Sequence, residues 1–331
     1  MIVWVLFFLM IGIFLALDLG VFNRNPHVIT YREASRWTMV WASLGILFSG
    51  VIYMIYQKGW IPLHHGSNPF DASIEYLTGY IIELTLSVDN IFVIAMIFKS
   101  FHIPLKYQHR VLFWGIIGAL VFRALTILFG VVLIESFSWT TYLFGIFLII
   151  TAFRMLKSED NSGFDPKTSW VYRTLRKIIP VTSKMEGNRF FIKKQGLMIA
   201  TPLFLALILI EFTDVLFALD SIPAILGITR DPFIVFTSNI FAILGLRSMY
   251  FFIANLLDSF HYLKYSLTVI LVFVGIKLIL SNHFHVSILV SLTVIIVSLL
   301  FGIYFSMRYK RKHLVASLPD KNKASEIQDE H

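Results

Sequence analysis

The stretches ELTLSVDNI at residues 83–91 and EFTDVLFALDSIPA at residues 211–224 decide the fold, because both place acids inside long apolar runs. An acid, five residues, an aspartate, a small polar residue and an isoleucine recur in the same order in the two stretches. The aligned pairs are Glu83 with Asp214, Asp89 with Asp220, Asn90 with Ser221, and Ile91 with Ile222. A carboxylate at the centre of a membrane helix costs about 2.5–3.5 kcal/mol on insertion scales. Two such clusters therefore predict a site that compensates their charge.

The composition indicates a membrane protein. Of the 331 residues, 57% are hydrophobic and only 15% are charged, with a mean hydropathy of +0.76, whereas soluble domains carry about 25% charged residues. Because about 20 apolar residues span a bilayer as a helix, the chain is predicted to be an all-α polytopic membrane protein with about nine transmembrane helices. The predicted spans cover residues 2–22, 38–56, 73–98, 111–134, 137–156, 196–226, 233–254, 264–282 and 286–306. The first span lacks a basic start, and so we expect a retained helix rather than a cleaved signal.

The basic residues predict the orientation in the cytoplasmic membrane. With the C-terminus in the cytoplasm, nine spans put the N-terminus outside, and 23 of the 28 lysines and arginines lie on the inner side. Cytoplasmic loops carry such an excess of basic residues. The net charge of +8 is then explained by anionic lipid at the inner face, and no nucleic-acid partner is expected. The chain has no cysteine, which excludes disulfides and thiolate metal sites.

Two further matches indicate an internal duplication. GALVFR at 118–123 resembles AILGLR at 242–247, and LFGIFLI at 143–149 resembles FVGIKLI at 273–279. A unit of three spans crosses the membrane an odd number of times, and so the two copies must have opposite orientations, as in many secondary transporters. The predicted parts are two N-terminal helices with an outer loop (1–72), a first repeat (73–156), a cytoplasmic loop (157–195), a second repeat (196–282), a final helix with a basic end (283–313) and a disordered tail (314–331).

The polar side chains within the spans predict a site for a hard divalent cation. Oxygen ligands suit Mg²⁺, Ca²⁺ or Mn²⁺, whereas zinc, copper and nickel usually recruit imidazole or thiolate. The candidate metal ligands are Asp18, Glu83, Asp89, Asn90, Glu211, Asp214 and Asp220, with Ser221 as an auxiliary ligand. Arg123, Arg247 and Lys277 could compensate the charge, or could pair with the acids only to hold the helices together. Asn90 and Ser221 could equally form hydrogen bonds between helices.

The helical period separates the two acids of each cluster. Glu83 and Asp89 project about 120° apart on one helix, as do Asp214 and Asp220. Either the helix is broken between them, or each carboxylate faces a different neighbour. Pro223 favours a break in the second cluster, because it cannot donate a hydrogen bond within the helix and clashes with the preceding turn.

The loop between the repeats contains one regular element. WVYRTLRKII at 170–179 places Trp170, Leu175 and Ile178 at helical spacing, with basic residues among them. This pattern is typical of an amphipathic helix that lies on the membrane surface. No soluble domain is expected beside it.

The sequence resembles the TerC family of integral membrane proteins, and in particular the nine-span Alx branch of manganese exporters. The resemblance covers ALDLG (16–20), TGYIIELTLSVDNIFV (78–93), FRALTILFG (122–130), ATPLFLALILIEFTDVLFALDSIPAI (200–225), DPFIVFTSNIFAILGLRSMYF (231–251) and LKYSLTVILVFVGIKLIL (263–280). It implies Mn²⁺ efflux. The family's acidic signature then falls on Glu83, Asp89, Asn90, Glu211, Asp214 and Asp220, with Asp18 as a further acid.

The function expected from the sequence is secondary export of a divalent cation in exchange for protons. No Walker A motif is present to indicate ATP hydrolysis, no enzymatic activity is expected, and Mn²⁺ is the substrate rather than a permanently bound cofactor. The lipid bilayer is the remaining partner, and the oligomeric state stays open. Two alternatives remain: an exporter of an amino acid or other small solute, and a non-transporting factor for membrane-protein assembly. An intramembrane aspartyl protease is disfavoured because its GxGD motif is missing.

Overall fold

The computed structural model describes residues 2–17, 29–63, 68–137, 139–157, 170–182, 185, 187–194, 197–253, 263–280, 284 and 286–316. The helices within these ranges are α1 (Ile2–Leu17), α2 (Tyr31–Gln57), α3 (Pro69–Ser100), α4 (Leu105–Ser136), α5 (Thr140–Lys157), α6 (Trp170–Ile178), α7 (Pro202–Leu226), α8 (Pro232–Ile253), α9 (Leu263–Leu280) and α10 (Ile288–Ala316). Two short strands, β1 (Phe191–Lys194) and β2 (Leu197–Ala200), pair antiparallel. The tail predicted to be disordered (314–331) lies mostly outside the described residues.

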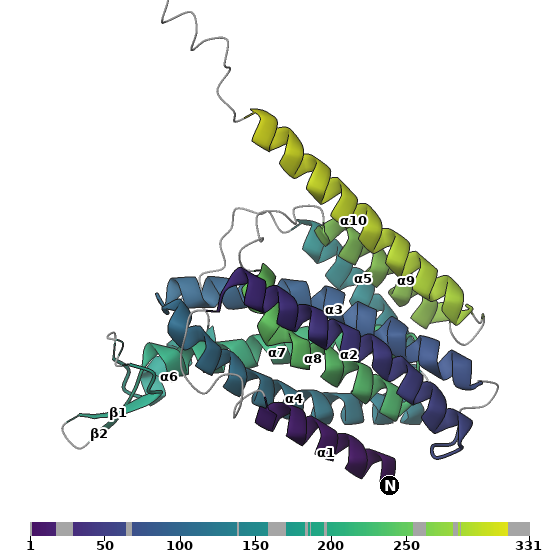
Figure 1. The fold of residues 1–331 in the computed structure, drawn as a ribbon, viewed down its shortest axis with the longest axis horizontal. Helices are drawn as coiled ribbons and strands as arrows, with labels where there is room; N and C mark the ends of the chain where they lie inside the picture. The colour runs from purple at the N-terminus through teal and green to yellow at the C-terminus, as the bar shows by residue number, and fades with distance from the viewer. Residues whose placement is uncertain are drawn as a thin grey trace, which may run out of the picture.

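The prediction of a helical polytopic membrane protein is confirmed. In the described ranges six helices are long and apolar enough to cross a membrane, and three shorter apolar helices accompany them. These helices occupy the nine sequence ranges predicted to be spans, although the number that cross the bilayer stays a prediction. They run side by side as one bundle, with α10 along one edge (Figure 1).

The structure differs from the sequence prediction before α7. Residues 197–200 were expected to begin a membrane span at 196, but they form β2 instead. The helix begins only after Thr201, with Pro202 in its first turn. Proline fits this position because its missing N–H would have no partner within the helix anyway. Apolar residues in a short strand resemble the start of a helix in hydropathy alone, which explains the error.

The long helices pack in a pattern that fits the predicted duplication. The first predicted repeat covers α3, α4 and α5, and the second covers α7, α8 and α9. Contacts join α3 to α8 and α4 to α7, which are equivalent pairs when the repeats are aligned, and α5 to α9, which are each other's counterparts. An inverted pair of units related by a two-fold axis makes contacts of this kind.

Two glycines permit the close crossing of α5 and α9. A Cβ atom added to Gly145 would lie 2.7 Å from the Gly275 carbonyl oxygen, and one added to Gly275 would lie 2.8 Å from the Gly145 carbonyl oxygen. The two glycines are aligned partners in LFGIFLI and FVGIKLI. Small residues allow membrane helices to approach closely, and here the same position of both predicted repeats serves this purpose.

Replacing Gly145 by alanine is therefore expected to lower the free energy of unfolding by about 1–3 kcal/mol, the usual cost of overpacking. The obstacle is a backbone carbonyl and cannot rotate away. Thermal unfolding in detergent measures the effect. Gly50→Ala is the control, because a Cβ atom there meets nothing within 4 Å. Equal unfolding temperatures for the two variants would show that the crossing is looser than described.

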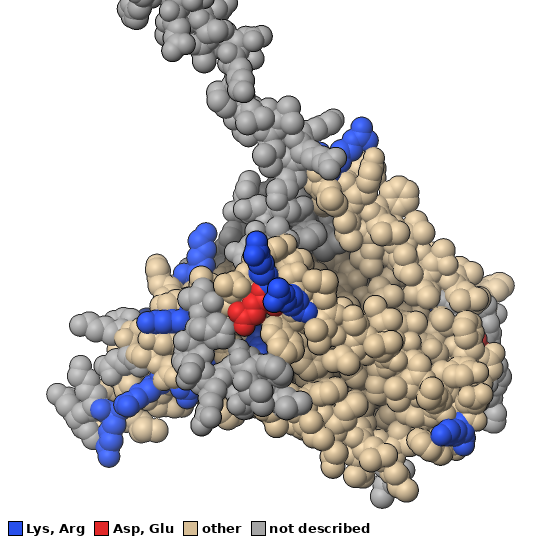
Figure 2. Space-filling view, viewed as in Figure 1, with Lys and Arg blue, Asp and Glu red and all other residues tan. Residues whose placement is uncertain are grey.

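The two ends of the bundle differ in charge. The end that carries α6 and the β1–β2 hairpin also carries the start of α4 and the end of α3; Phe101 contacts Tyr172 of α6, and Arg110 stacks on Phe190. We call this the basic end. Most of the basic side chains visible in Figure 2 lie toward it, and the broad face between the ends is almost free of visible charge. The amphipathic helix predicted at 170–179 is confirmed as α6.

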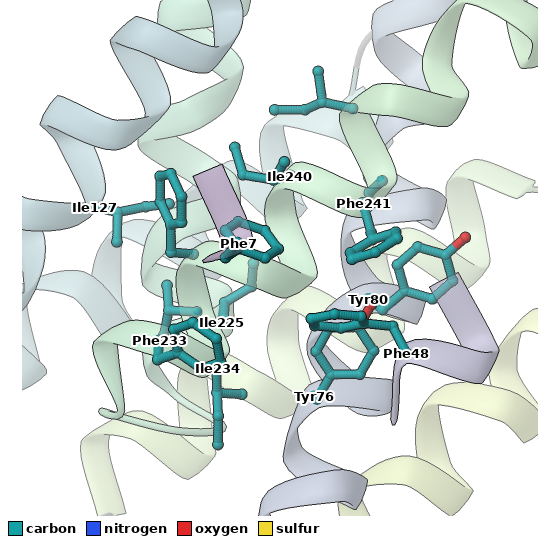
Figure 3. Packing of buried hydrophobic residues seen from close by; sticks show 14 of the residues in the cluster. Phe7, Phe48, Tyr76, Tyr80, Ile127, Ile225, Phe233, Ile234, Ile240 and Phe241 are labelled. Atoms are coloured by element: carbon teal, nitrogen blue, oxygen red, sulfur yellow. The ribbon is translucent and has the colours of Figure 1, made fainter. Parts of the chain in front are cut away.

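Aromatic and aliphatic side chains pack together in one buried cluster (Figure 3). Phe48 of α2 and Phe241 of α8 have ring centroids 4.5 Å apart, and Tyr76 stacks on Tyr80 along α3. The Tyr76 hydroxyl donates a hydrogen bond to the Gly45 carbonyl at 3.0 Å. These residues belong to one buried cluster that also includes Phe7 of α1. The cluster packs α1, α2, α3 and α8 together and includes residues of α4 and α7.

Candidate functional site

A buried arginine joins four helices at the centre of the bundle. Arg123 of α4 is 1% exposed. Its Nη1 forms an ion pair with Oε1 of Glu83 on α3 and donates to Oδ1 of Asn239 on α8 at 3.0 Å. Nη2 lies 3.4 Å from Oδ1 of Asp214 on α7, and Nη1 lies 3.2 Å from the Ser221 hydroxyl. The aligned acids of the two repeats, Glu83 and Asp214, thus meet at one guanidinium.

Asn239 is a member of this cluster that the sequence prediction missed. It is fully buried. Its Nδ2 donates a hydrogen bond to Oε2 of Glu83 at 3.1 Å, while its Oδ1 accepts from Arg123. One amide therefore holds both partners of the ion pair. The sequence could have indicated Asn239, because it is a polar residue inside a predicted span, at the start of the NIFAILGLR motif.

Beside this cluster, α7 carries two carboxylates with unsatisfied oxygens. Glu211 and Asp214 are three residues apart and lie on the same side of the helix. Oε2 of Glu211 and Oδ2 of Asp214 are buried and have no hydrogen-bond partner among the described residues. The Glu211 carboxylate packs against the backbone of α4 at Gly118, in space that any side chain there would fill. Buried carboxylate oxygens normally have a partner, and so this pair is suited to hold a cation or a proton.

A small cavity adjoins Asp214. Its volume is about 20 Å³, enough for one water molecule or a single ion. Asn90, Asp214 and Arg247 are its polar lining residues, and the remaining walls are apolar. Asn90 and Arg247 belong to the parts of α3 and α8 that run toward the basic end. The cavity therefore lies between the centre of the bundle and the basic end.

The predicted site residues fall into three groups. Glu83, Asp214, Arg123 and Ser221 meet in the central cluster, Glu211 lies beside Asp214, and Asn90 and Arg247 face the cavity. Lys277 lies apart from them, where its Nζ donates to the Ser291 hydroxyl at 3.0 Å.

Asp18 and the side chains of Asp89 and Asp220 lie outside the described part of the structure. Within the described part, no three or more His, Cys, Asp or Glu side chains are grouped to hold a metal.

The predicted break at Pro223 is wrong. The helix α7 continues through Pro223 to Leu226, and α3 is continuous from Pro69 to Ser100. A proline costs one helical hydrogen bond, but packed neighbouring helices in membrane proteins compensate for this loss. The helices are therefore unbroken at the acidic clusters. Glu83 on α3 and Asp214 on α7 reach Arg123 from different helices.

The site has an excess of acid among its described members. Glu83 and Asp214 share the guanidinium of Arg123, Glu211 adds a third carboxylate beside Asp214, and Arg247 at the cavity is the second basic side chain. Charges buried in a low-dielectric interior need compensation. The arrangement can accept a cation or protons next to Asp214, whereas an anion would add to the existing negative charge.

Comparison with known proteins supports the resemblance found in the motifs. Residues 70–314 match the model of the integral membrane protein TerC family. The chain is 44% identical over 296 residues to the putative membrane-bound redox modulator Alx of Escherichia coli K12, covering 88% of this chain and 90% of that protein. Uncharacterized membrane proteins of Myxococcus xanthus and Rickettsia bellii are 46% and 42% identical over 88% and 94% of this chain, and over 88% and 98% of their own lengths. No solved structure matches. The chain therefore belongs to the TerC family of integral membrane proteins.

Proposed function

We propose that the protein is a secondary transporter that exports Mn²⁺ across the cytoplasmic membrane in exchange for protons. The observation that carries this proposal is the acidic pair: buried oxygens of Glu211 and Asp214 have no hydrogen-bond partner among the described residues, and Asp214 lines a cavity the size of one ion. Neutral carboxyls in this position can hold protons, and ionised ones can hold a cation.

The chemistry of the donors supports a hard cation. The polar residues that line the cavity are Asp214, Asn90 and Arg247, and the Glu211 carboxylate lies beside Asp214 on α7. Carboxylate and amide oxygens suit Mn²⁺, Mg²⁺ and Ca²⁺. The resemblance to manganese exporters selects Mn²⁺ among them.

Proton exchange follows from the energetics of export. Moving two positive charges outward against the membrane potential costs about 4.6 kcal/mol per 100 mV, twice the value for one charge. Carboxylates bind metal only when they are deprotonated. Protons that enter from the outer side would therefore release the metal from the same carboxylates and would supply the driving force.

The position of the central cluster supports alternating access between two repeats. Arg123 and Glu83 belong to the first proposed repeat, whereas Asp214 and Asn239 belong to the second. Their contacts therefore cross the boundary along which the repeats would rock. In this proposal the basic end faces the cytoplasm, the N-terminus lies outside, and the cavity beside Asp214 is the cytoplasmic part of the transport path.

The alternative of a small-solute exporter is less well supported. An amino acid would need a cation for its carboxylate; Arg123 already contacts Glu83 and Asp214, which leaves Arg247 in the cavity lining as the candidate. The relatives from Escherichia coli and Shigella flexneri are named redox modulators. This chain has no cysteine, and so a thiol–disulfide cycle within it is excluded. We therefore place cation transport before these possibilities, and before a role in membrane-protein assembly.

The test is transport by the purified protein in liposomes that contain a pH-sensitive dye. We expect Mn²⁺ to move across the membrane and protons to move in the opposite direction, each dependent on the gradient of the other. Movement of an amino acid without Mn²⁺ would replace the proposal with the small-solute alternative. Absence of flux of either substrate would favour the assembly role.

Gly118→Ala tests Glu211 without removing it. The new methyl group would occupy the space of the Glu211 carboxylate, which lies at the end of a flexible side chain and can move at small cost. We expect Mn²⁺ binding to weaken by about 10–100-fold, the usual effect of disturbing the support of a ligand, with the unfolding temperature almost unchanged. Binding titrations measure the affinity. Gly12→Ala, where a Cβ atom meets nothing within 4 Å, should bind as the wild type does; equal affinities for both variants would remove Glu211 from the site.

A further inference from the structure

Three buried side chains form a layer between the cavity beside Asp214 and the basic end. They are Phe98 of α3, Gln108 of α4 and Tyr250 of α8. The Tyr250 hydroxyl donates a hydrogen bond to Oε1 of Gln108 at 3.0 Å. The Tyr250 ring lies edge-on to the ring of Phe98, with the ring centroids 5.6 Å apart. Tyr250 therefore joins both other members of the layer, which we call the tyrosine layer.

The helical period places the tyrosine layer one turn from the cavity on each helix. Ile94, Leu112 and Leu246 line the cavity from α3, α4 and α8. Each of them is four residues from the layer member of its own helix, on the side toward the basic end. Residues four apart share one face of a helix and differ by about 6 Å along its axis. All three helices therefore carry first a cavity residue and then a layer residue toward the basic end.

The orientation of the Gln108 side chain is fixed by a second hydrogen bond. Its Nε2 donates to the Ile103 carbonyl oxygen at 3.0 Å, in the connection between α3 and α4. The amide nitrogen is thus occupied, and Oε1 is directed at the Tyr250 hydroxyl. Ile103, the two rings of the layer and the three cavity residues belong to one buried apolar cluster. The bond from Tyr250 to Gln108 is therefore a polar contact inside an apolar cluster.

The tyrosine layer crosses the boundary between the two predicted repeats. Phe98 and Gln108 belong to the first predicted repeat, whereas Tyr250 belongs to the second. Helix α8 packs against both α3 and α4. Rocking of the repeats against each other would move Tyr250 away from both of its partners at once. The same motion would connect the cavity with the basic end.

We propose that Phe98, Gln108 and Tyr250 form the inner gate of the transport path. This inference rests on the proposed function, in which the basic end faces the cytoplasm and the cavity beside Asp214 receives the ion. The structure is then the state in which the tyrosine layer separates this cavity from the cytoplasm. Inward opening breaks the hydrogen bond from Tyr250 to Gln108 and admits water and Mn²⁺ to Asp214.

The chemistry of this contact suits a gate. A neutral hydrogen bond within a protein replaces hydrogen bonds to water, and so its net contribution to stability is small. When the gate opens, the hydroxyl and the amide regain water as a partner. In the closed state they stay paired, because an unpaired polar group in an apolar interior is costly. The bond therefore favours closure without preventing opening.

Cysteine labelling from the cytoplasmic face tests the gate, because the chain contains no cysteine of its own. Ile116→Cys places a thiol in the cavity lining, one turn further from the gate than Leu112. The reagent is a membrane-impermeant, positively charged methanethiosulfonate, added to inside-out membrane vesicles. We expect slow labelling of this reporter, and labelling at least tenfold faster when Tyr250→Phe or Gln108→Leu is added. Each of these substitutions leaves one polar group unpaired in the closed state only.

A double variant separates loss of the bond from loss of packing. Tyr250→Phe with Gln108→Leu should slow labelling again, because replacing both partners of a buried hydrogen bond by apolar groups leaves neither of them unsatisfied. Labelling from the outer face, measured in right-side-out vesicles, should not increase in any gate variant. Faster labelling from both faces would show a general loosening of the bundle and would overturn the gate.

Tyr76→Phe is the matched control, added to the same reporter. It removes another buried tyrosine hydroxyl that donates at 3.0 Å, in this case to the Gly45 carbonyl, near the opposite end of α3 from Phe98. It should leave the labelling rate unchanged. Equal rates in the gate variants and this control would overturn the gate, and either single gate variant suffices if the other fails to fold.

The failure of the gate and the failure of the proposed function are distinguishable, because labelling needs no metal. Wild-type protein that transports Mn²⁺, together with gate variants that label no faster than the reporter, would reject the gate alone. Faster labelling of the gate variants from the cytoplasmic face, without Mn²⁺ flux in the wild type, would reject the proposed export of Mn²⁺ alone.

Discussion

Arg123→Met is expected to lower the free energy of unfolding by about 3–5 kcal/mol, the usual cost of removing one partner from a buried ion pair. The variant leaves Glu83 and Asp214 buried without the cation that both contact, and it also removes the hydrogen bonds to Asn239 and Ser221. Thermal or denaturant unfolding of the purified protein in detergent measures the loss.

A second substitution should recover part of this loss. Glu83→Gln in the Arg123→Met background removes the charge that the first substitution strands, and the Asn239 amide can still donate to the glutamine oxygen. Thr126→Val is the control on α4, because the Thr126 hydroxyl bonds only to carbonyls of its own helix in the described part. A loss below about 1 kcal/mol, typical of an exposed pair, would show that Arg123 does not hold the bundle together.

Asp214→Asn is expected to abolish Mn²⁺ transport while the protein stays folded. The amide has the shape of the carboxylate, and its oxygen can still accept from Arg123, as Oδ1 of Asp214 does. The substitution removes the negative charge and one oxygen donor beside the cavity. It also removes a group that can carry a proton. Both the metal flux and the opposing proton flux should therefore disappear.

Liposome flux, compared at equal amounts of incorporated protein, measures this effect. Glu33→Gln is a suitable control, because it removes an acid from the first turn of α2, at the basic end and outside the site. The control should transport as the wild type does. If Asp214→Asn retained Mn²⁺ flux, the acidic pair could not be the transport site, and the proposed function would lose its main support.

The helices and their acids could be predicted from the sequence because hydropathy acts locally. A run of about 20 apolar residues becomes a membrane helix almost regardless of its neighbours. The recurring acids at Glu83 and Asp214 stand out against such runs, and their spacing indicated the duplication. Gly145 and Gly275 were aligned by the same comparison, and the structure places them in contact.

Errors arose where hydropathy does not distinguish between structures. Residues 197–200 have the apolar character of a helix but pair with residues 191–194 as a strand. Pro223 is unfavourable within an isolated helix, yet α7 continues through it. In both places the outcome depends on hydrogen-bond partners or packed neighbours that lie elsewhere in the chain.

The sequence by itself determined that this protein is a bundle of membrane helices with two related acidic segments. Only the tertiary structure decided that Glu83 and Asp214 share Arg123, that Asn239 completes this cluster, and that Lys277 lies apart from it and bonds to Ser291. The physical reason is that a hydrophobic run specifies its own helix through local burial. The partner of a buried charge, by contrast, is set by which helix faces it across the bundle, and residues up to 156 positions apart in sequence, Glu83 and Asn239, meet at Arg123.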